Sequence, residues 1–455
     1  MIVLVEGFDP DAVALAKLLA LEGRTVRIAG FGDPPLSAVG PLEAAGVTVE
    51  PGADLDASPG PADVAYLDVW TPEVAPRVVR LRAQGTIVSC LADLVLERHR
   101  GPSIGITGTA GKTTTTALVG QVLAEAGIDH AVGRGARAGN LWPTVDLLER
   151  PPGAGQLLLL ELTSSHLAFM HHSPTIAAVT CFWPDHLELH GGLAAYRAAK
   201  EVIVRYQVAG DLVVMNADDD AASFASVTPA IRHAFSLHGP ISQGAYLDSG
   251  RGVVIAGDGR ETALGSIHTG TPHPGNAVAA AAIAAAAGAT TAAIARGLAR
   301  AATPPWRAEQ SGSVAGARVV NDGMAATPSK CAAVLRRFPL SSVVLVAGGT
   351  ADIGAGPVHA SPEEQALLDL ACDEVARAAR LVVLFGDGGE VLAPRLRSRG
   401  VVVCATGSLD EAVARAVNAA PGADALVFSP MFPVALEDRA RFAALVACPA
   451  GKADA

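Results

Sequence analysis

The segment Ser103–Thr113, with the sequence SIGITGTAGKT, constrains the fold of this chain more than any other. Its first five residues indicate a short apolar strand, and residues 114–126 that follow it indicate a helix. Glycines between a strand and a helix let backbone N–H groups turn inward around phosphate oxygens, and the helix N-terminus adds a favourable dipole. The segment therefore predicts a phosphate-binding loop on the sheet of an α/β domain.

The residues of this loop predict a site for ATP and Mg²⁺. Lys112 is expected to offset charge on the β and γ oxygens, and the Thr113 hydroxyl is expected to bind Mg²⁺. The spacing is the short G-T-x-G-K-T form, since Ile106 occupies the first glycine position of the common G-x-x-x-x-G-K-[ST] pattern. A chance Gly/Thr-rich turn is the alternative, and the flanking strand and helix speak against it. The candidate nucleotide-binding residues here are Gly108, Thr109, Ala110, Gly111, Lys112, Thr113 and Thr114.

The alternation of apolar strands and helical stretches predicts an α/β protein of three domains. Residues 1–101 indicate a Rossmann-like N-terminal domain, and residues 102–304 indicate a central P-loop ATPase domain with a parallel sheet. Residues 305–455 indicate a second Rossmann-like domain, and Pro304-Pro305 is a credible linker because proline cannot continue a helix. The predicted strands are short and apolar: 2–5, 25–29, 103–107, 157–162, 176–181, 212–215, 343–347, 381–385, 401–404 and 425–428.

Composition and charge exclude several classes of protein. The net charge is −11 and no dense basic stripe is present, so nucleic acid is not an expected partner. The longest apolar run, residues 277–287, is shorter than the roughly 20 residues that span a bilayer, and it indicates a buried helix. The start of the chain lacks a basic leader, so no membrane insertion and a cytoplasmic location are expected.

Two further patterns narrow the chemistry. The six cysteines are scattered without a CxxC pair, which favours reduced thiols over a metal site or a disulfide framework. The loop after the first strand, residues 6–11, reads EGFDPD and is not the G-x-G-x-x-G that wraps a dinucleotide pyrophosphate. A nicotinamide-dependent dehydrogenase is therefore disfavoured.

Beyond the phosphate loop, a series of motifs resembles the Mur ligase family, with the highest density in the central block. The matching segments are Gly139-Asn140, Leu160–Ser165, Asp185-His186-Leu187, Tyr196–Lys200, Asn216–Asp219, Asn276–Ala280, Arg307 and Asn321-Asp322. The resemblance implies an ATP-dependent ligase that adds glutamate, as the D or the L enantiomer, to UDP-N-acetylmuramoyl-L-alanine through an acyl phosphate. It also implies a monomer that acts in peptidoglycan precursor synthesis.

The resemblance implies roles for individual residues. Lys112, His186 and Lys200 are implied to be catalytic, with Lys200 carbamylated. Thr113 and Glu161 are implied to bind one Mg²⁺, and His186 with the Lys200 carbamate a second one. The implied nucleotide contacts outside the loop are Asn276 at the adenine, Arg307 at the γ-phosphate and Asp322 at the ribose. The implied contacts to the acceptor substrate are Thr71, Asn140, Thr163 and Ser164.

Each of these residues also has an ordinary structural interpretation. Glu161 ends a predicted buried strand, where a carboxylate is costly unless it is paired or binds a metal, so an ion-pair role is the alternative. His186 alone would be a satisfied histidine, Lys200 alone a lysine on a helix surface, and Arg307 a cation at a helix start. Their order along the chain favours the functional interpretation of the set.

Departures from the family pattern bear on the substrates. Residues 323–328 read GMAATP where the glutamate-adding relatives have S-K-A-T-N, and residues 348–354 lack the lysine of G-G-x-x-K-G. Glu73 follows Thr71-Pro72 where the family has glycine, and residues 429–434 read SPMFPV. A carboxylate side chain needs cationic or several N–H partners. Open alternatives are a ligase for a different amine outside peptidoglycan synthesis, a catalytically idle ATP-binding module, and a plain P-loop kinase or NTPase.

Overall fold

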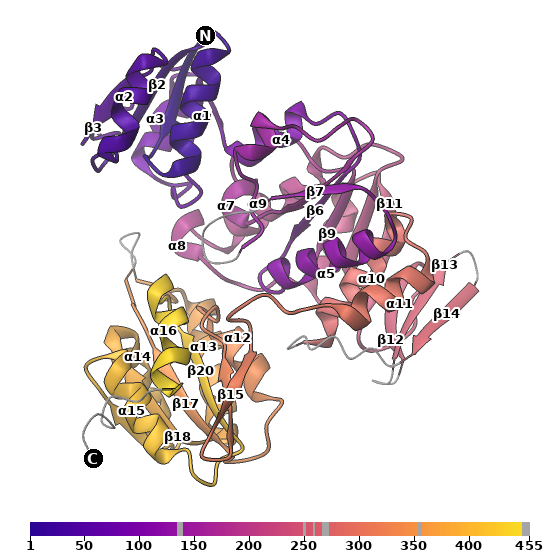
Figure 1. Cartoon of the computed structure of the whole chain (residues 1–455), viewed down its shortest axis with the longest axis vertical. Helices are drawn as coiled ribbons and strands as arrows, with labels where there is room; N and C mark the ends of the chain where they lie inside the picture. Colours follow the sequence, from indigo (N-terminus) through magenta and orange to yellow (C-terminus); the bar gives the residue numbers. More distant parts are fainter. Residues whose placement is uncertain (134–139, 249–251, 258–259, 266–272, 353–356, 448–455) are drawn as a thin grey trace. The chain divides into compact units, whose positions relative to one another are not determined.

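Three β-sheets carry the fold in the computed structural model, which describes residues 1–133, 140–248, 252–257, 260–265, 273–352 and 357–447 (Figure 1). The predicted residues Gly139, Gly354 and Cys448 lie outside this part of the chain. The α/β fold class predicted from the sequence is confirmed.

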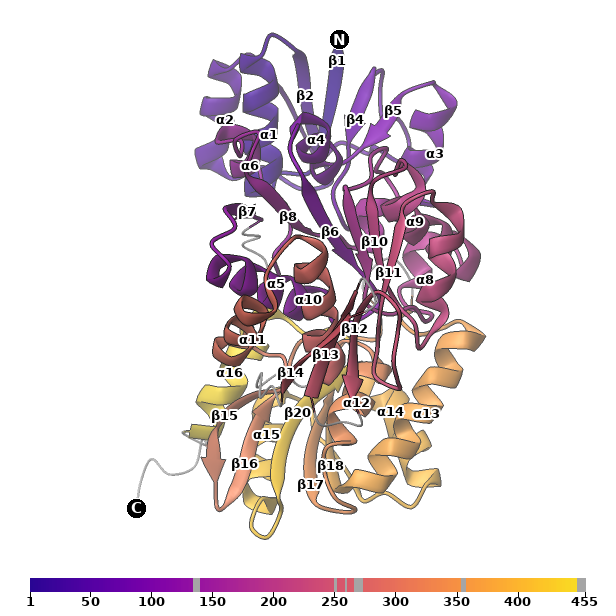
Figure 2. The same cartoon turned by 90° about the vertical axis from the view of Figure 1, so that its right-hand side faces the viewer.

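The first sheet has five parallel strands in the order β3-β2-β1-β4-β5. Figure 2 shows α1 and α2 on one side of it and α3 on the other. Asp9 begins α1, because its side chain accepts the N–H groups of Asp11 and Ala12. The elements are β1 (Ile2–Glu6), α1 (Pro10–Leu21), β2 (Thr25–Gly30), α2 (Leu36–Ala44), β3 (Thr48–Pro51), β4 (Val64–Tyr66), α3 (Pro76–Ala83), β5 (Ile87–Ser89) and α4 (Leu91–Arg98).

The second sheet has nine strands in the order β14-β13-β12-β11-β10-β9-β6-β8-β7. Strand β6 lies between β8 and β9, with parallel pairing on both sides, so its carboxyl end opens on the middle of the sheet. The strands are β6 (Ser103–Thr107), β7 (His130–Val132), β8 (Leu157–Glu161), β9 (Ile176–Val179), β10 (Leu212–Asn216), β11 (Ile231–Ser236), β12 (Gly244–Asp248), β13 (Gly252–Gly257) and β14 (Arg260–Gly265).

Helices α5, α10 and α11 pack on one face of this sheet, against Ile104, Ile106 and Leu159. Helix α10 is buried along residues 275–284, as the alanine-rich run predicted. The helices of this part are α5 (Lys112–Glu125), α6 (Asp146–Glu149), α7 (Ser164–Leu167), α8 (Leu187–His190), α9 (Leu193–Arg205), the 3-10 helix η1 (Asp220–Val227), α10 (Pro274–Ala286) and α11 (Thr291–Arg300).

The third sheet has six strands in the order β15-β16-β20-β17-β18-β19. Its alternate residues face opposite sides: Val343 and Leu345 pack under α12, α13 and α14, whereas Val344 and Val346 pack under α15 and α16. The elements are β15 (Glu309–Val314), β16 (Ala317–Asn321), α12 (Pro328–Leu335), β17 (Val343–Gly348), α13 (Pro362–Ala378), β18 (Ala379–Phe385), α14 (Gly386–Ser398), β19 (Val403–Ala405), α15 (Leu409–Ala419), β20 (Ala425–Met431) and α16 (Leu436–Ala447).

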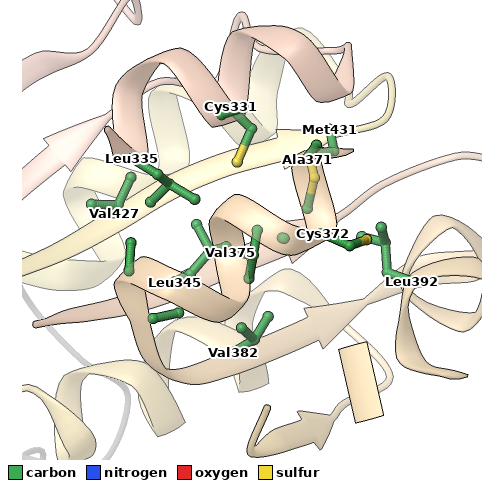
Figure 3. Packing of buried hydrophobic residues seen from close by; sticks show 14 of the residues in the cluster. Cys331, Leu335, Leu345, Ala371, Cys372, Val375, Val382, Leu392, Val427 and Met431 are labelled. Atoms are coloured by element: carbon green, nitrogen blue, oxygen red, sulfur yellow. The ribbon is translucent and has the colours of Figure 1, made fainter. Parts of the chain in front are cut away.

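Figure 3 shows the core under α12 and α13, where Cys331 and Cys372 lie among Leu335, Val375 and Leu345 as small apolar groups. Among the described residues the five cysteines are free, and burial raises the pKa of the Cys372 thiol to about 11. No helix in the described ranges is long and apolar enough to cross a membrane.

The sequence missed the antiparallel strands. Strands β13 and β14 extend the second sheet through antiparallel pairs, and β15 adds an antiparallel edge to the third. The chain forms two compact units. The first comprises Met1–Trp183, Leu189–His268 and Gly275–Ala301, and the second comprises Pro184–Glu188, Thr269–Pro274 and Ala302–Ala455. Both the first and second sheets belong to the first unit, so the boundary near residue 101 stays a prediction.

Candidate active site

The phosphate loop between β6 and α5 has the backbone that its glycines predict. Gly108 has φ 147°, and a Cβ there would lie 1.9 Å from the Thr180 hydroxyl oxygen. Gly111 has φ 81° and directly precedes α5, and its Cβ would lie 2.5 Å from Oδ1 of Asn276. Only glycine fits both positions without strain. The loop therefore lies against Asn276, the residue that the family resemblance implies at the adenine.

Lys112 extends its ammonium group over the loop. Its Nζ donates to the carbonyl of Gly108 at 2.9 Å and to that of Thr109 at 3.4 Å. These are weak partners for a half-buried cation, since carbonyls carry no net charge. A phosphate oxygen at the loop would be a stronger partner.

Thr113, in the first turn of α5, and Glu161, at the end of β8, form a hydrogen-bonded pair. The Thr113 hydroxyl donates to Glu161 Oε1 at 2.7 Å and lies 3.2 Å from Oδ1 of Asn140. Oε2 of Glu161 accepts the N–H of Leu141 at 2.8 Å, and the residue is 1% exposed. A hydroxyl, a carboxylate and an amide oxygen are ligands that suit Mg²⁺. Among the described residues, no three His, Cys, Asp or Glu side chains form a metal-binding group.

Lys200 on α9 is buried at the same loop and is not a surface lysine. It is 1% exposed, its Nζ donates to Gly108 O at 3.1 Å, and it lies 4.8 Å from the centre of the Tyr196 ring. The Tyr196 hydroxyl lies 2.9 Å from the Thr109 hydroxyl. Lys200 therefore lies at the phosphate loop, and its carbamylation stays a prediction.

His186 belongs to the second unit, so its predicted pairing with Lys200 of the first unit stays a prediction. It has φ 54°, and its ring lies 3.7 Å from Asp185 and 3.4 Å from Glu188. Burial alone would lower the pKa of His186, but these two carboxylates outweigh it and the pKa is raised.

The predicted acceptor contacts form two groups. Near the loop, the Thr163 side chain caps α7 by accepting the N–H of His166, and the next residue, Ser164, is buried. Asn140 lies beside Thr113, as described above. Thr71 is placed differently: it is 4% exposed, and its hydroxyl donates to Glu6 at 2.6 Å. Thr71 therefore has a structural contact of its own at the first sheet.

Sequence reasoning missed His166, which the Thr163–His166 capping box fixes in one orientation. Its Nδ1 accepts the Thr163 N–H, so the proton of the neutral ring resides on Nε2. Burial, with Lys112 as a second cause, lowers the pKa of His166 to about 3. The ring packs edge-on to Trp142, and both line a cavity of about 170 Å³ together with Glu6. The spacing of Thr163 and His166, three residues apart at the start of a helix, is the sequence pattern that could have predicted this capping contact.

Arg307 and Asp322 lie near each other in the second unit. Asp322 is buried, and it accepts the Ser429 hydroxyl at 2.8 Å and the Ala308 N–H at 3.0 Å. Burial raises the pKa of Asp322 to about 7 against these bonds and the nearby charge of Arg307. Trp306 and Ala308, on either side of Arg307, have φ values of 60° and 51°, a conformation that is costly for such residues.

Comparison with known proteins finds related ligases. The model of the Mur ligase middle domain matches residues 106–285. A UDP-N-acetylmuramoylalanine–D-glutamate ligase of Frankia casuarinae is 34% identical over 446 residues, which are 94% of this chain and 88% of the relative. The ligase of that name from Symbiobacterium thermophilum is 31% identical, over 81% of this chain and 79% of the relative.

Solved structures share the fold at lower identity. The MurF ligase of Thermotoga maritima in complex with ADP has a TM-score of 0.62 and 15% identity, over 93% of this chain and 95% of that one. The UDP-N-acetylmuramate–alanine ligase MurC of Thermotoga maritima has a TM-score of 0.59 and 20% identity, over 97% of each chain. These likenesses concern the fold.

Proposed function

The chain belongs to the Mur ligase family, and from this premise we propose that it joins glutamate to UDP-N-acetylmuramoyl-L-alanine at the expense of ATP, in the synthesis of peptidoglycan precursors. The observation that carries the proposal is the phosphate loop. Lys112, the Thr113–Glu161 pair and buried Lys200 lie at one loop, whose glycines let it pass close to Thr180 and Asn276. A catalytically idle module would have no need of three such groups at one loop.

In the first step, a carboxylate oxygen of the acceptor attacks the γ-phosphorus of ATP, and the bond from that phosphorus to the β-bridging oxygen breaks. The products are an acyl phosphate and ADP. Lys112 offsets the negative charge that gathers on the transferring phosphoryl oxygens. Thr113 and Glu161 would hold Mg²⁺, which would supply positive charge to offset that of the phosphates.

In the second step, the amine of glutamate attacks the acyl carbon. The amine loses a proton to solvent, the carbon–oxygen bond to phosphate breaks, and amide and inorganic phosphate are released. Holding both reactants in place lowers such a barrier by up to roughly 7–11 kcal/mol. Asn140, Thr163 and Ser164 are the proposed contacts to the acceptor, since they lie around the Thr113–Glu161 pair or directly after β8.

The remaining parts of the proposal follow the resemblance. Asn276, Arg307 and Asp322 contact the nucleotide, and His186 with the carbamate of Lys200 binds a second Mg²⁺. Thr71 contacts the acceptor from the first sheet. The three domains comprise residues 1–101, 102–304 and 305–455, and the protein acts as a cytoplasmic monomer.

The test is phosphate release by the full chain with ATP, Mg²⁺, UDP-N-acetylmuramoyl-L-alanine and either D-glutamate, L-glutamate or a panel of other amino acids. Release with one glutamate enantiomer supports the proposal and names the enantiomer. Release with a different amine alone supports the second candidate, a ligase of other specificity, which the absence of lysine from residues 323–328 favours. No release with any amine contradicts both.

A further inference from the structure

Arg439, on α16 of the second unit, is a partly buried cation without an acidic partner among the described residues. One terminal nitrogen donates to the sulfur of Met324 at 2.8 Å, and the other donates to the carbonyl of Val434 at 3.0 Å. Its Nε is buried and has no hydrogen-bond partner within the ranges that the structure describes. A thioether is a weak acceptor and a carbonyl carries no net charge, so the guanidinium is poorly satisfied.

Other arginines of this unit are satisfied differently. Arg441, two residues further along α16, pairs with Asp410, and Arg399 pairs with Asp373 at the surface. Burial lowers the pKa of Arg439, and no carboxylate counteracts this shift. A partly buried guanidinium without an acidic partner is costly, so this arrangement is suited to binding an anion from outside the chain.

The surroundings of Arg439 make room for the guanidinium beside β16. A Cβ on Gly323 would lie 3.0 Å from Cγ of Arg439 and 3.2 Å from its Cβ, so glycine lets the side chain pass to Met324. In the same segment, Thr327 is 3% exposed and its hydroxyl has no partner in the described structure. Two donors in the described structure therefore lack partners here: the Thr327 hydroxyl, and Nε of Arg439, whose side chain passes Gly323. Both lie at the segment 323–327, directly after Asp322.

This segment lies where ligands bind in open parallel sheets. It follows the carboxyl end of β16, and the neighbouring strand β20 supplies Ser429 to Asp322 and the Met431 N–H to the carbonyl of Ala325. Pockets of such sheets open at the carboxyl ends of the strands. The position is thus suited to a small anionic ligand.

We propose that Arg439 recognises the side-chain carboxylate of the incoming amino acid. The inference rests on the proposed function, which supplies an amino acid with that group. A guanidinium binds a carboxylate through two parallel N–H···O bonds, and the carboxylate replaces the sulfur of Met324 as its partner. Arg439 thereby provides a cation that residues 323–328 and the described part of 348–354 do not contain.

The experiment compares Arg439→Met and Arg439→Lys with Arg441→Met as the matched control on the same helix. For Arg439→Met, the KM for glutamate rises about 10- to 100-fold, whereas the KM for ATP stays within about twofold. The preference for glutamate over glutamine falls by a similar factor, because glutamine lacks the charge. Arg439→Lys retains part of the preference, and Arg441→Met leaves all three quantities unchanged.

Unchanged glutamate KM and unchanged discrimination in folded Arg439→Met protein overturn the inference, as does an equal rise in the two KM values. If Arg439→Met does not fold, as judged by its thermal melting, full discrimination by Arg439→Lys and Arg439→Gln overturns it instead.

Binding of labelled glutamate to the full chain, measured by equilibrium dialysis with ATP and Mg²⁺, separates this inference from the proposed function. Arg439-dependent binding without phosphate release supports the inference and contradicts the ligase proposal. Phosphate release with glutamate that does not depend on Arg439 leaves the ligase proposal intact and overturns the inference. Wild-type chain that binds no glutamate also overturns it.

Discussion

The strands β6 and β16 both end beside a parallel neighbour and are followed by candidate site residues. The charged side chains at the two ends differ in the hydrogen-bond partners that the chain gives them. At β6, Glu161 accepts the Thr113 hydroxyl and a backbone N–H, and both Lys112 and Lys200 donate to Gly108. Every one of these groups has a partner within the loop or on the neighbouring strand. At β16, Asp322 has a raised pKa and Arg439 has no acidic partner within the described ranges.

The charged groups at the two strand ends therefore depend on a bound ligand to different degrees. The loop at β6 holds its shape through its own glycines and carbonyls, so it is preorganised for a phosphate group. At the end of β16, the chain offsets the burial of Asp322 and of the partly buried Arg439 only in part. We therefore expect substitutions at β6 to reduce turnover most and substitutions at β16 to affect specificity and stability.

Removing the cation of the loop should have the largest effect. Lys112→Met removes the charge that faces the phosphoryl oxygens, and we expect the rate of ADP formation to fall by about 10²- to 10³-fold. A coupled assay of ADP release measures this, with Lys17→Met on α1 as a control lysine outside the site. Turnover within threefold of wild type would remove Lys112 from the mechanism and contradict the expectation that substitutions at β6 reduce turnover most.

Removing Lys200 should have a smaller and partly reversible effect. Lys200→Ala is expected to lower turnover by about 100-fold, because the proposed carbamate no longer stabilises charge near the acceptor. Added formate or acetate should restore part of the rate by supplying a carboxylate at the vacated position. The same additives should not rescue Lys112→Met, which lacks a cation. Undiminished turnover of Lys200→Ala would show that its burial is purely structural.

Neutralising Glu161 should alter the response to Mg²⁺. Glu161→Gln keeps the shape and one acceptor for Thr113 but loses the charge, so the Mg²⁺ concentration for half-maximal rate should rise by about tenfold. Titration of Mg²⁺ at saturating ATP measures this. A rate that falls equally at all Mg²⁺ concentrations would assign Glu161 to holding Thr113 and Leu141 alone.

The smallest effect should appear in the pH dependence of stability at β16. The pKa of Asp322 is raised from its ordinary value to about 7, so the folded chain binds more protons than the unfolded chain between about pH 4 and pH 7. The stability that Asp322 contributes is present below pH 4 and is lost as the pH rises through 7. Each kcal/mol lost lowers a melting temperature by roughly 2–4 °C in domains of this size.

Asp322→Asn should remove this dependence. We expect its melting temperature to exceed that of the wild type by a few degrees at pH 8, with the difference shrinking toward pH 5. Scanning calorimetry of the full chain at several pH values measures this. A difference that does not change with pH would mean that Asp322 does not titrate in this range.

The sequence predicted β6, its loop and α5 to within two residues because a continuous motif encodes them. Strand, glycines and helix start follow one another, and Gly108 and Gly111 have the positive φ angles that such a turn needs. The burial of Lys200 could not be predicted from a continuous motif. It depends on α9 packing beside the loop through Tyr196, a contact between residues far apart in the chain.

At the end of β16, Asp322 was singled out from the sequence, but the contacts of Arg439 could not be predicted, for the same reason. Arg439 lies in the run LEDRAR, whose charges are typical of a solvated helix face, and its neighbours Met324 and Val434 come from other segments. Strand β14 was missed because its sequence RETALG has no apolar run, and β13 was missed because glycines flank its four apolar residues.

The alanine-rich helix α10 has a consequence for how the interior is assembled. Its residues from 275 to 284 are buried on all sides, against Leu118, Val119 and Ile104 of the same core. Six of these ten residues are alanine, which has no rotamers to lose, whereas leucine at those six positions would add a cost of about 0.5–1 kcal/mol each. The middle of the second sheet is thus covered by a helix whose alanines gain little from apolar area and lose no side-chain freedom.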